Sequence, residues 1–550
     1  MSFILKAAAC PYWLNMDPSY PYLFNSLNLV NGLSPAHVDH PGTPLQVIGF
    51  LVIWSMNLGS NANDVIHKVI SDPELYLRSI STVLIFGFSF MSAWFALYVY
   101  KKTGDKIAAV LTQLPIINFL VLKSWGSMEA IIPVVANVDP EPLLISIMLL
   151  FNLFFFKLFL SKDQKEDWAS VLFLGLICGL GVAAKLTFLP ILLLPLMIIK
   201  WRMKVFFIFV SLISFIVCTL PIVSFYPRFW KWAVALTTHT GQYGQGKEGL
   251  VDISKYFSTW WSGIVKPYWF LMMLVVTSLV LSAIKIFKKQ DQKETRFLFV
   301  IACGIMLQFA LVAKQYNPHY LLPGISLFSG LFLFFYLDQL SKVERVKKII
   351  LIFIVVFVVQ GIGTAFIYRN SLENLKMRTI AFYRNLRVNY PQCMFIGFYG
   401  QPAAAPDHAV LYGNQWSLHG EEQQVCDLFP HSLFFDKFLY HIESCNRRIL
   451  ADDVLKVMPC TIFIGSEFDF SKGPFKVKLL AEGPFALRAY GLAGSDEKQA
   501  TSLFLSAQEA YNKGEYEQAF SLALKSRELK FQPEKAIDIF LTQVYRMLKK

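Results

Sequence analysis

Residues 140–160 read PEPLLISIMLLFNLFFFKLFL, an apolar run whose only charged residues are Glu141 and Lys157. About 20 apolar residues in a helix cross the roughly 30 Å hydrocarbon core of a bilayer. A transmembrane β-strand would instead alternate apolar and polar residues over about ten positions, and this run does not alternate. The stretch therefore predicts a transmembrane α-helix.

The rest of the chain repeats this pattern. Further apolar runs lie at 44–60, 79–100, 106–123, 168–186, 188–200, 204–225, 263–284, 297–313, 320–337 and 348–367. Of the 550 residues, 55% are hydrophobic and 16% charged, whereas soluble domains carry about a quarter charged residues. This composition excludes a disordered chain, a coiled coil, a secreted disulfide scaffold and a single soluble enzyme. It predicts an all-α polytopic membrane protein with about ten to eleven transmembrane helices.

Basic clusters set the expected orientation of these helices. Lys and Arg are enriched in short cytoplasmic loops, and such clusters occur at 101–106, 200–204, 285–296 and 342–348. Alternation places 124–139, 226–262, 314–319 and everything after 368 on the external face. The run 44–60 is short and contains Gly49 and Asn57, so we expect an interfacial or re-entrant helix there. Ten spans with both termini outside remain.

The net charge of +13 lies with the membrane part. Residues 369–550 hold 22 Lys and Arg against 20 Asp and Glu, so the basic excess belongs to the residues before them. The positive-inside rule explains it, and attraction to membrane lipids or to a lipid phosphate is a compatible alternative. No segment resembles a nucleic-acid-binding module. We expect a bacterial inner (plasma) membrane protein with its external loops and C-terminal domain on the periplasmic face.

The C-terminal region divides into two parts. Residues 369–500 mix short β-like runs with turn residues, which predicts an external soluble α+β domain; its four cysteines, Cys393, Cys426, Cys445 and Cys460, fit either disulfides or buried thiols. Residues 501–550 resemble one tetratricopeptide (TPR) repeat, with small Ala507 and Ala519 and a turn at Gly514. A generic helical hairpin is the alternative. Such a hairpin should pack on the preceding domain or on a protein partner. The expected domains are 1–78 (external catalytic loop with interfacial helices), 79–368 (transmembrane core), 369–500 and 501–550.

Three external segments carry candidate chemistry. The first, 17–46, holds Asp17, Asp39 and His40 just before the interfacial helix; Asp17 alone could be a helix cap. The second, 129–142, ends in Asp139 and Glu141, which suit either a helix N-terminus or a base, a metal ligand or a sugar-hydroxyl acceptor.

The third segment, 237–249, is a glycine-rich loop with His239 and Tyr243 that would serve as a lid or as a plain linker. Three more basic side chains lie at the expected external ends of spans: Lys185, Lys314 and His319. A lysine at such a depth is costly unless it is paired or reaches the interface, and a lipid-linked phosphate would pair with it.

The order of these elements resembles the polyprenyl-phosphate-dependent glycosyltransferases of the GT-C superfamily, in the family 39-like group of protein O-mannosyltransferases and aminoarabinose transferases. The matching elements cover roughly residues 11–370: DPSY (17–20), DHPGTPL (39–45), YLRSISTVLIFGF (76–88), VANVDPEPLL (135–144), GLGVAAKLTFLPILLLP (179–195) and NPHYLLP (317–323). Three features depart from the family. Pro18 replaces the usual Glu after Asp17, Gly42 replaces a Pro, and the family's first span is absent, so we expect an upstream span to be missing from this chain.

The resemblance implies transfer of a sugar from a polyprenyl-phosphate donor to a lipid, glycan or protein acceptor at the external face. It implies Asp17 as the base, with Asp39 and His40 orienting acceptor or sugar. Asp139 and Glu141 would be supporting acids, with ligation of a divalent metal as an option; no cofactor is required. The remaining implied substrate-binding residues are Tyr20, Lys185, His239, Tyr243, Lys314, His319 and Tyr320. The alternatives are a transporter or flippase for lipid-linked glycans and a non-catalytic envelope scaffold.

Overall fold

The computed structural model describes residues 6–39, 41–115, 136–161, 167–244, 246–290, 293–341, 343–391, 393–398, 406–418, 420–429, 434–436, 441–444, 447–450, 461–465, 477–484, 487–492, 497–529 and 535–548. They form two compact units. Unit 1 comprises residues 1–9, 21–372 and 415–421, and unit 2 comprises 10–20, 373–414 and 422–550.

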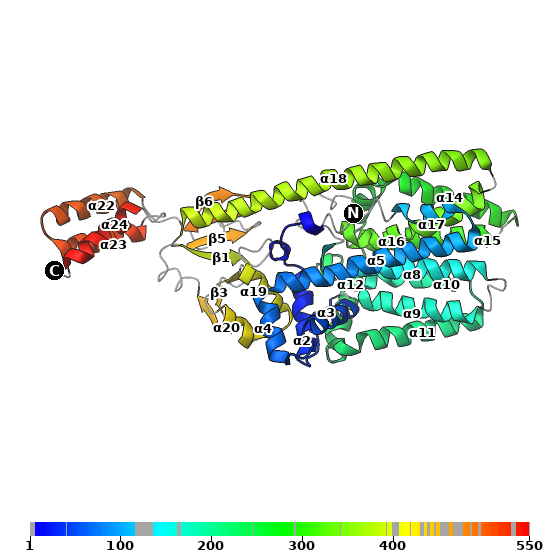
Figure 1. The fold of residues 1–550 in the computed structure, drawn as a ribbon, viewed down its shortest axis with the longest axis horizontal. Coiled ribbons are helices and arrows are strands. Elements are labelled where there is room, and N and C mark those ends of the chain that lie inside the picture. The colour runs from blue at the N-terminus through cyan, green and yellow to red at the C-terminus, as the bar shows by residue number, and fades with distance from the viewer. Residues whose placement is uncertain are drawn as a thin grey trace. The chain divides into compact units, whose positions relative to one another are not determined.

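Unit 1 is a helical bundle (Figure 1). Its longer helices are α2 (Ser19–Val30), α3 (Thr43–Met56), α4 (Ala62–Ser71), α5 (Pro73–Thr103), α8 (Pro140–Leu160), α9 (Trp168–Ala184), α11 (Trp201–Thr219), α12 (Tyr226–Thr238), α14 (Trp269–Phe287), α15 (Lys293–Lys314) and the first half of α18 (Glu344–Asn389). Its shorter ones are α6 (Lys106–Leu111), η3 (Leu186–Leu192), α10 (Leu193–Leu196), η4 (Leu220–Phe225), η5 (Gln242–Gly244), α13 (Ile253–Thr259), η6 (Trp260–Val265), η7 (Pro318–Leu321), α16 (Leu322–Ser326), α17 (Phe328–Phe335) and η8 (Tyr336–Leu340).

Within the described residues, seven helices are long and apolar enough to cross a membrane: Pro73–Thr103, Pro140–Leu160, Trp201–Thr238, Trp269–Phe287, Lys293–Lys314, Pro318–Leu340 and Lys347–Asn389. This confirms the all-α polytopic membrane fold. Trp168–Ala184 and Leu186–Leu196 are shorter apolar helices, the second because Pro190 and Pro195 break the expected run 188–200. The 14-residue α3 is also short, as expected for run 44–60. Most of run 106–123 lies outside the described residues.

Aromatic side chains fill the centre of the bundle. The Phe155 and Phe297 rings meet at a tilt with 4.8 Å between their centroids, and the Phe159 and Phe334 rings meet edge to face at 5.1 Å. The phenylalanines in the second half of α8 thus supply much of the core. Close helix contact is achieved by small residues: a Cβ on Gly179 would lie 2.3 Å from the Ser211 carbonyl oxygen, so α9 and α11 pack almost backbone to backbone.

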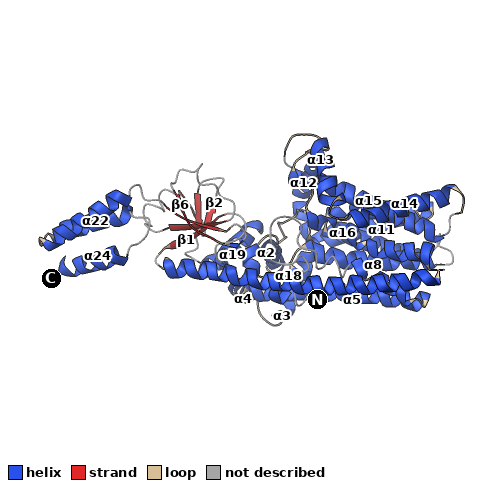
Figure 2. Ribbon diagram, turned by 90° about the horizontal axis from the view of Figure 1, so that it is seen from above, coloured by secondary structure: helices blue, strands red, loops and turns tan. Residues whose placement is uncertain are grey.

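Unit 2 contains the strands, which form one sheet (Figure 2). They are β1 (Met394–Phe398), β2 (Phe434–Asp436), β3 (His441–Ser444), β4 (Arg447–Leu450), β5 (Thr461–Gly465), β6 (Val477–Glu482) and β7 (Arg488–Leu492), in the order β4-β3-β2-β1-β5-β7-β6. Strand β1 is parallel to β2 and β5, with Met394 opposite Thr461, and the outer pairs are antiparallel. Its helices are η1 (Tyr12–Asn15), α19 (Pro406–Trp416, continuing into unit 1), α20 (Glu422–Leu428), α22 (Glu497–Asn512), α23 (Tyr516–Leu529) and α24 (Lys535–Leu548).

The expected α+β fold and helical hairpin both occur in unit 2. Phe382 and Leu386, near the end of α18, pack against Ile462 and Ile464 of β5. In the hairpin, Ala507 and Ala519 are fully buried between α22 and α23, and Gly514 takes a φ of 80° in the turn, which favours glycine. A third helix, α24, completes this small core through residues such as Val544. Cys393 and Cys426 are both disulfide-bonded; Cys445 and Cys460 lie outside the described residues.

Candidate active site

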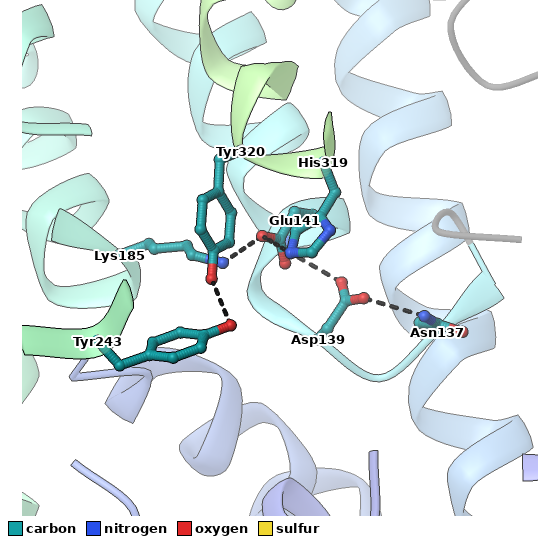
Figure 3. A network of polar contacts seen from close by, with 7 residues as sticks. All are labelled: Asn137, Asp139, Glu141, Lys185, Tyr243, His319 and Tyr320. Atoms are coloured by element: carbon teal, nitrogen blue, oxygen red, sulfur yellow. Dashed lines mark hydrogen bonds and ion pairs between the residues drawn. The ribbon is translucent and has the colours of Figure 1, made fainter. Parts of the chain in front are cut away.

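The ends of several helices bring a group of ionisable side chains together in unit 1 (Figure 3). Asp139 caps α8: its Oδ1 accepts a hydrogen bond of 3.2 Å from the Glu141 backbone N–H, and Pro140 fixes the first turn. Glu141 therefore lies in the first turn of α8, where the helix dipole favours a carboxylate. Both carboxyl groups are buried.

Lys185 lies where α9 ends and η3 begins. Its backbone is extended (φ −163°, ψ 135°), which turns the side chain away from the axis of α9. The ammonium group pairs directly with Glu141 Oε1, and the two side chains are 3% and 2% exposed. The same ammonium lies 4.2 Å from the centre of the Tyr320 ring, a cation–π contact. A buried lysine needs such partners, because an unpaired charge there would be strongly destabilising.

The element η7 adds His319 and Tyr320. His319 Nε2 lies 3.6 Å from Glu141 Oε1, so Lys185 and His319 approach the same carboxylate oxygen. The His319 and Tyr320 rings meet edge to face at 4.5 Å. The carboxylate of Glu141 is therefore the centre of the network, with Lys185, His319 and the Asp139 cap around it.

Asp139 differs electrostatically from its neighbour. Burial is the main cause that raises the pKa of Asp139 well above its usual range, and the Glu141 charge raises it further. Lys185 and a hydrogen bond of 3.1 Å from Asn137 Nδ2 oppose this shift without cancelling it. The charged form of Asp139 is thus disfavoured, whereas Glu141 makes the direct contact with Lys185.

The glycine-rich loop covers one side of this network. Its two ends pair at His239 and Glu248 in an isolated β-bridge, and Tyr243 takes a positive φ of 55° at its tip. The Tyr243 hydroxyl lies 3.3 Å from that of Tyr320, and its backbone N–H donates to Gln315 Oε1 at 3.2 Å. Lys314 donates to the Thr237 carbonyl at 2.8 Å. The loop is therefore fastened to the end of α15, with one phenol reaching the site.

The structure brings together six of the expected site residues: Asp139, Glu141, Lys185, Tyr243, His319 and Tyr320. Lys314 and His239 belong to the fastening of the loop, and the His239 ring contacts the Thr238 hydroxyl at 3.0 Å. Asp17 and Tyr20 lie in unit 2, where Asp17 is exposed and precedes a cis bond to Pro18, and Tyr20 is buried. His40 lies outside the described residues.

Asp39 lies at the end of a tightly held loop. Its charge and that of Arg228 both act on the His37 imidazole, although burial dominates and lowers the pKa of His37. Sequence reasoning missed His37 and also Asn137, the partner of Asp139. A signal for Asn137 was present, since an Asn two residues before a capping Asp can reach that carboxylate; nothing in the sequence marked His37. Within the described residues, no group of three or more His, Cys, Asp or Glu is placed to hold a metal ion.

No protein-family model and no curated protein matches the chain. Among solved structures it is similar to ArnT from Cupriavidus metallidurans, at 11% identity over 87% of this chain and 95% of that one, with TM-scores of 0.46 for the apo state and 0.44, at the same identity and coverage, for the form bound to undecaprenyl phosphate. It is also similar to the apo oligosaccharyltransferase of Archaeoglobus fulgidus, at 11% identity over 71% and 60% of the two chains, with a TM-score of 0.36. With TM-scores below 0.5 these structures add nothing to the assignment of a function, which rests on the residues of the site.

Proposed function

We propose that the chain is a membrane glycosyltransferase that transfers a sugar from a polyprenyl-phosphate donor to a lipid, glycan or protein acceptor at the external face of the membrane. The observation that carries this proposal is the buried Lys185 ammonium, held at the ends of two spans by Glu141 and Tyr320. A fixed cation at that depth suits a phosphate whose tail lies in the bilayer.

The site has the parts that such a transfer needs. The acceptor hydroxyl or amine attacks the anomeric carbon, its proton passes to a carboxylate, and the lipid phosphate leaves with the bonding electron pair. Lys185, with His319 beside it, would balance the charge that develops on the phosphate. As the resemblance implies, the base should come from the first external loop, with Asp17 first and Asp39 second.

The position of the charges favours an enzyme over a transporter. Transporters commonly bind their substrate near the midplane, at breaks in the spanning helices. Here Asp139 and Glu141 begin α8, Lys185 follows α9, and His319 begins the span Pro318–Leu340. The group therefore gathers at helix ends, where a lipid headgroup and a water-soluble acceptor can meet.

The disulfides of unit 2 support the expected orientation. Disulfides persist in oxidising compartments and are rare in the cytosol, and Cys393 and Cys426 are both disulfide-bonded. This fits a C-terminal region on the external, periplasmic face. It also fits a site on that face, since Lys314 ends α15, the span that begins beside the basic cluster at 285–296.

Donor turnover tests the proposal. The protein in lipid nanodiscs would be incubated with radiolabelled polyprenyl-phosphate sugars beside Asp17→Asn, Asp39→Asn and Asp139→Asn variants. Turnover that is lost in Asp17→Asn alone establishes a transferase with that base, and loss in Asp39→Asn alone moves the base. Folded protein that turns over no donor refutes the proposal and favours a transporter or a scaffold.

A further inference from the structure

A short segment from the C-terminal region is built into unit 1. Residues 415–421 belong to that unit, although the residues before and after them in sequence, 373–414 and 422–550, belong to unit 2. These seven residues therefore pack with unit 1, although the chain on both sides of them packs with unit 2. A stretch that interrupts one compact unit to complete another needs a physical reason.

Two asparagines of α2, and a third in the turn just after its end, hold this segment. Asn25 Nδ2 donates to the Trp416 carbonyl at 3.3 Å, and Asn28 Nδ2 donates to the Ser417 carbonyl at 3.1 Å. Asn31 Nδ2 lies 3.5 Å from Glu421 Oε2. Asn25 and Asn28 are three residues apart and therefore neighbours on the surface of α2, and Asn31 follows in the next turn. Asn25 and Asn28 are buried.

The same two buried asparagines hold the first external loop. Asn25 Oδ1 accepts the backbone N–H groups of Ala36 and His37 at 2.6 and 2.9 Å, and Asn28 Nδ2 also donates to the Ser34 carbonyl at 3.3 Å. Each amide thus joins residues 34–37 to residues 416–417. Gln46 Nε2 adds a bond of 2.9 Å to the His37 carbonyl.

Side-chain packing joins the two segments a second time. The His37 ring meets the Trp416 ring edge to face at 5.2 Å and the Tyr22 ring at 5.4 Å. His37 is buried, so the indole of Trp416 forms part of the wall around it. Asp39, the acid of the DHPG element, follows two residues later, directly after the last of these contacts.

We propose that residues 415–421, here termed the C-terminal clamp, position the first external loop so that Asp39 is held for the transfer reaction. Trp416 and Asn25 are positioning residues and do not touch substrate. The C-terminal region would then contribute directly to turnover, in addition to any binding of a partner protein. The role in turnover rests on the proposed function, whereas the clamping of the loop does not.

Hydrogen exchange on the full-length protein in nanodiscs tests the clamp without any donor. The amides of Ala36 and His37 are protected by Asn25, so Trp416→Ala should speed their exchange about tenfold, the effect of weakening one or two buried hydrogen bonds. Peptides covering 139–185 should exchange as in the parent. Leu418→Ala is the matched control, because Leu418 lies in the same segment with its side chain exposed.

A second pair of variants tests the clamp by adding one methyl group at a glycine. A Cβ on Gly420 would lie 2.2 Å from Asn28 Oδ1, whereas a Cβ on Gly363 of α18 meets nothing within 4 Å. Gly420→Ala should therefore raise exchange at residues 34–37, and Gly363→Ala should not. Unchanged exchange in both Trp416→Ala and Gly420→Ala would overturn the clamp.

Turnover per bound donor then tests the positioning role. Trp416→Ala should lower kcat per donor-binding site about tenfold, with the donor KM within about twofold of the parent, and Trp416→Phe should restore most of it. Faster exchange with unchanged turnover per site would show that the loop is clamped for stability only, which overturns the role in positioning. A parent without turnover refutes the proposed function and the positioning role together, and the exchange data still decide whether the clamp exists.

Discussion

Replacing Lys185 by Met should abolish productive binding of the lipid phosphate and also destabilise the protein. The Lys185 and Glu141 side chains are 3% and 2% exposed. Removal of one partner leaves the other charge buried and uncompensated, which costs about 3–5 kcal/mol in such pairs. The single variant alone is therefore ambiguous, because lost activity could follow from lost folding.

The double variant Lys185→Met, Glu141→Gln separates the two effects. It removes both charges and keeps the volume of both side chains, and replacing a buried ion pair by neutral groups of similar volume is often neutral or stabilising. The thermal midpoint should therefore recover to near the parent value. Lipid-phosphate binding should not recover, because the ammonium is still absent.

The magnitude for binding follows from the contact that is lost. A hydrogen bond to a charged group contributes about 1.5–3 kcal/mol, which corresponds to a Kd about 10- to 150-fold weaker. The assay is equilibrium binding of radiolabelled polyprenyl phosphate to protein in nanodiscs, with the thermal midpoint of each sample measured in parallel.

Lys285→Met is the matched control. Lys285 Nζ lies 3.0 Å from Asp338 Oδ2, and that carboxylate is fully buried. This ion pair joins α14 to η8 and contains none of the residues of the site. Its loss should lower the thermal midpoint and leave lipid-phosphate binding within about twofold. A double variant at Lys185 and Glu141 that is stable and still binds polyprenyl phosphate as tightly as the parent would refute Lys185 as the phosphate contact.

Three further predictions follow from the site and the clamp. Asp139→Asn should keep most of the turnover, because the base is expected in the first external loop. The pKa of Asp139 is raised in the folded state, so the stability of the parent should fall as pH rises above the usual value of about 3.8. The variant should lack this slope, and thermal midpoints measured across pH will check it. Tyr243→Phe removes the 3.3 Å contact with the Tyr320 hydroxyl and should raise the donor KM about 2- to 12-fold with little change in thermal midpoint; an unchanged KM would separate the loop from donor binding. Burial raises the pKa of Glu421 to about 7, so the clamp should loosen as pH rises from about 4.5 through 7, and hydrogen exchange at residues 34–37, corrected for intrinsic rates, should follow that trend in the parent and lose it in Glu421→Gln.

The spans were predictable because hydropathy is a local property. The run at 140–160 became α8 with the same bounds, since about 20 apolar residues between a capping Asp and a polar end leave one solution in a bilayer. The run at 188–200 did not become one helix as expected. Pro190 and Pro195 remove backbone donors and break it into η3 and α10. The start of α8 was predictable because Asp139 stands before Pro140 as its cap, whereas α5 begins at Pro73, before the expected run 79–100.

The composition of the site was predictable, and its pairing was not. Asp139, Glu141, Lys185 and His319 stood out because ionisable residues at the ends of apolar runs are few and costly. The pairing of Lys185 with Glu141 depends on how α8 packs against α9. No local sequence pattern encodes this tertiary contact. The clamp was beyond prediction for the same reason: Asn25 and Trp416 are 391 residues apart, and a Trp in a polar segment carries no signal of its partner.

Glu141 and the lipid phosphate would compete for the same Lys185 ammonium. The Lys185 ammonium is already paired with the Glu141 carboxylate. A phosphate that binds to this ammonium must therefore displace a buried carboxylate from it. The displaced carboxylate would keep His319, at 3.6 Å, as a partner, so its charge would not be left alone. Glu141 would then act as a resident anion that stabilises the empty site and weakens the hold on the leaving phosphate. Glu141→Gln should accordingly tighten binding of the product polyprenyl phosphate and slow turnover through product inhibition, whereas a residue that merely supports the fold would change neither in that direction.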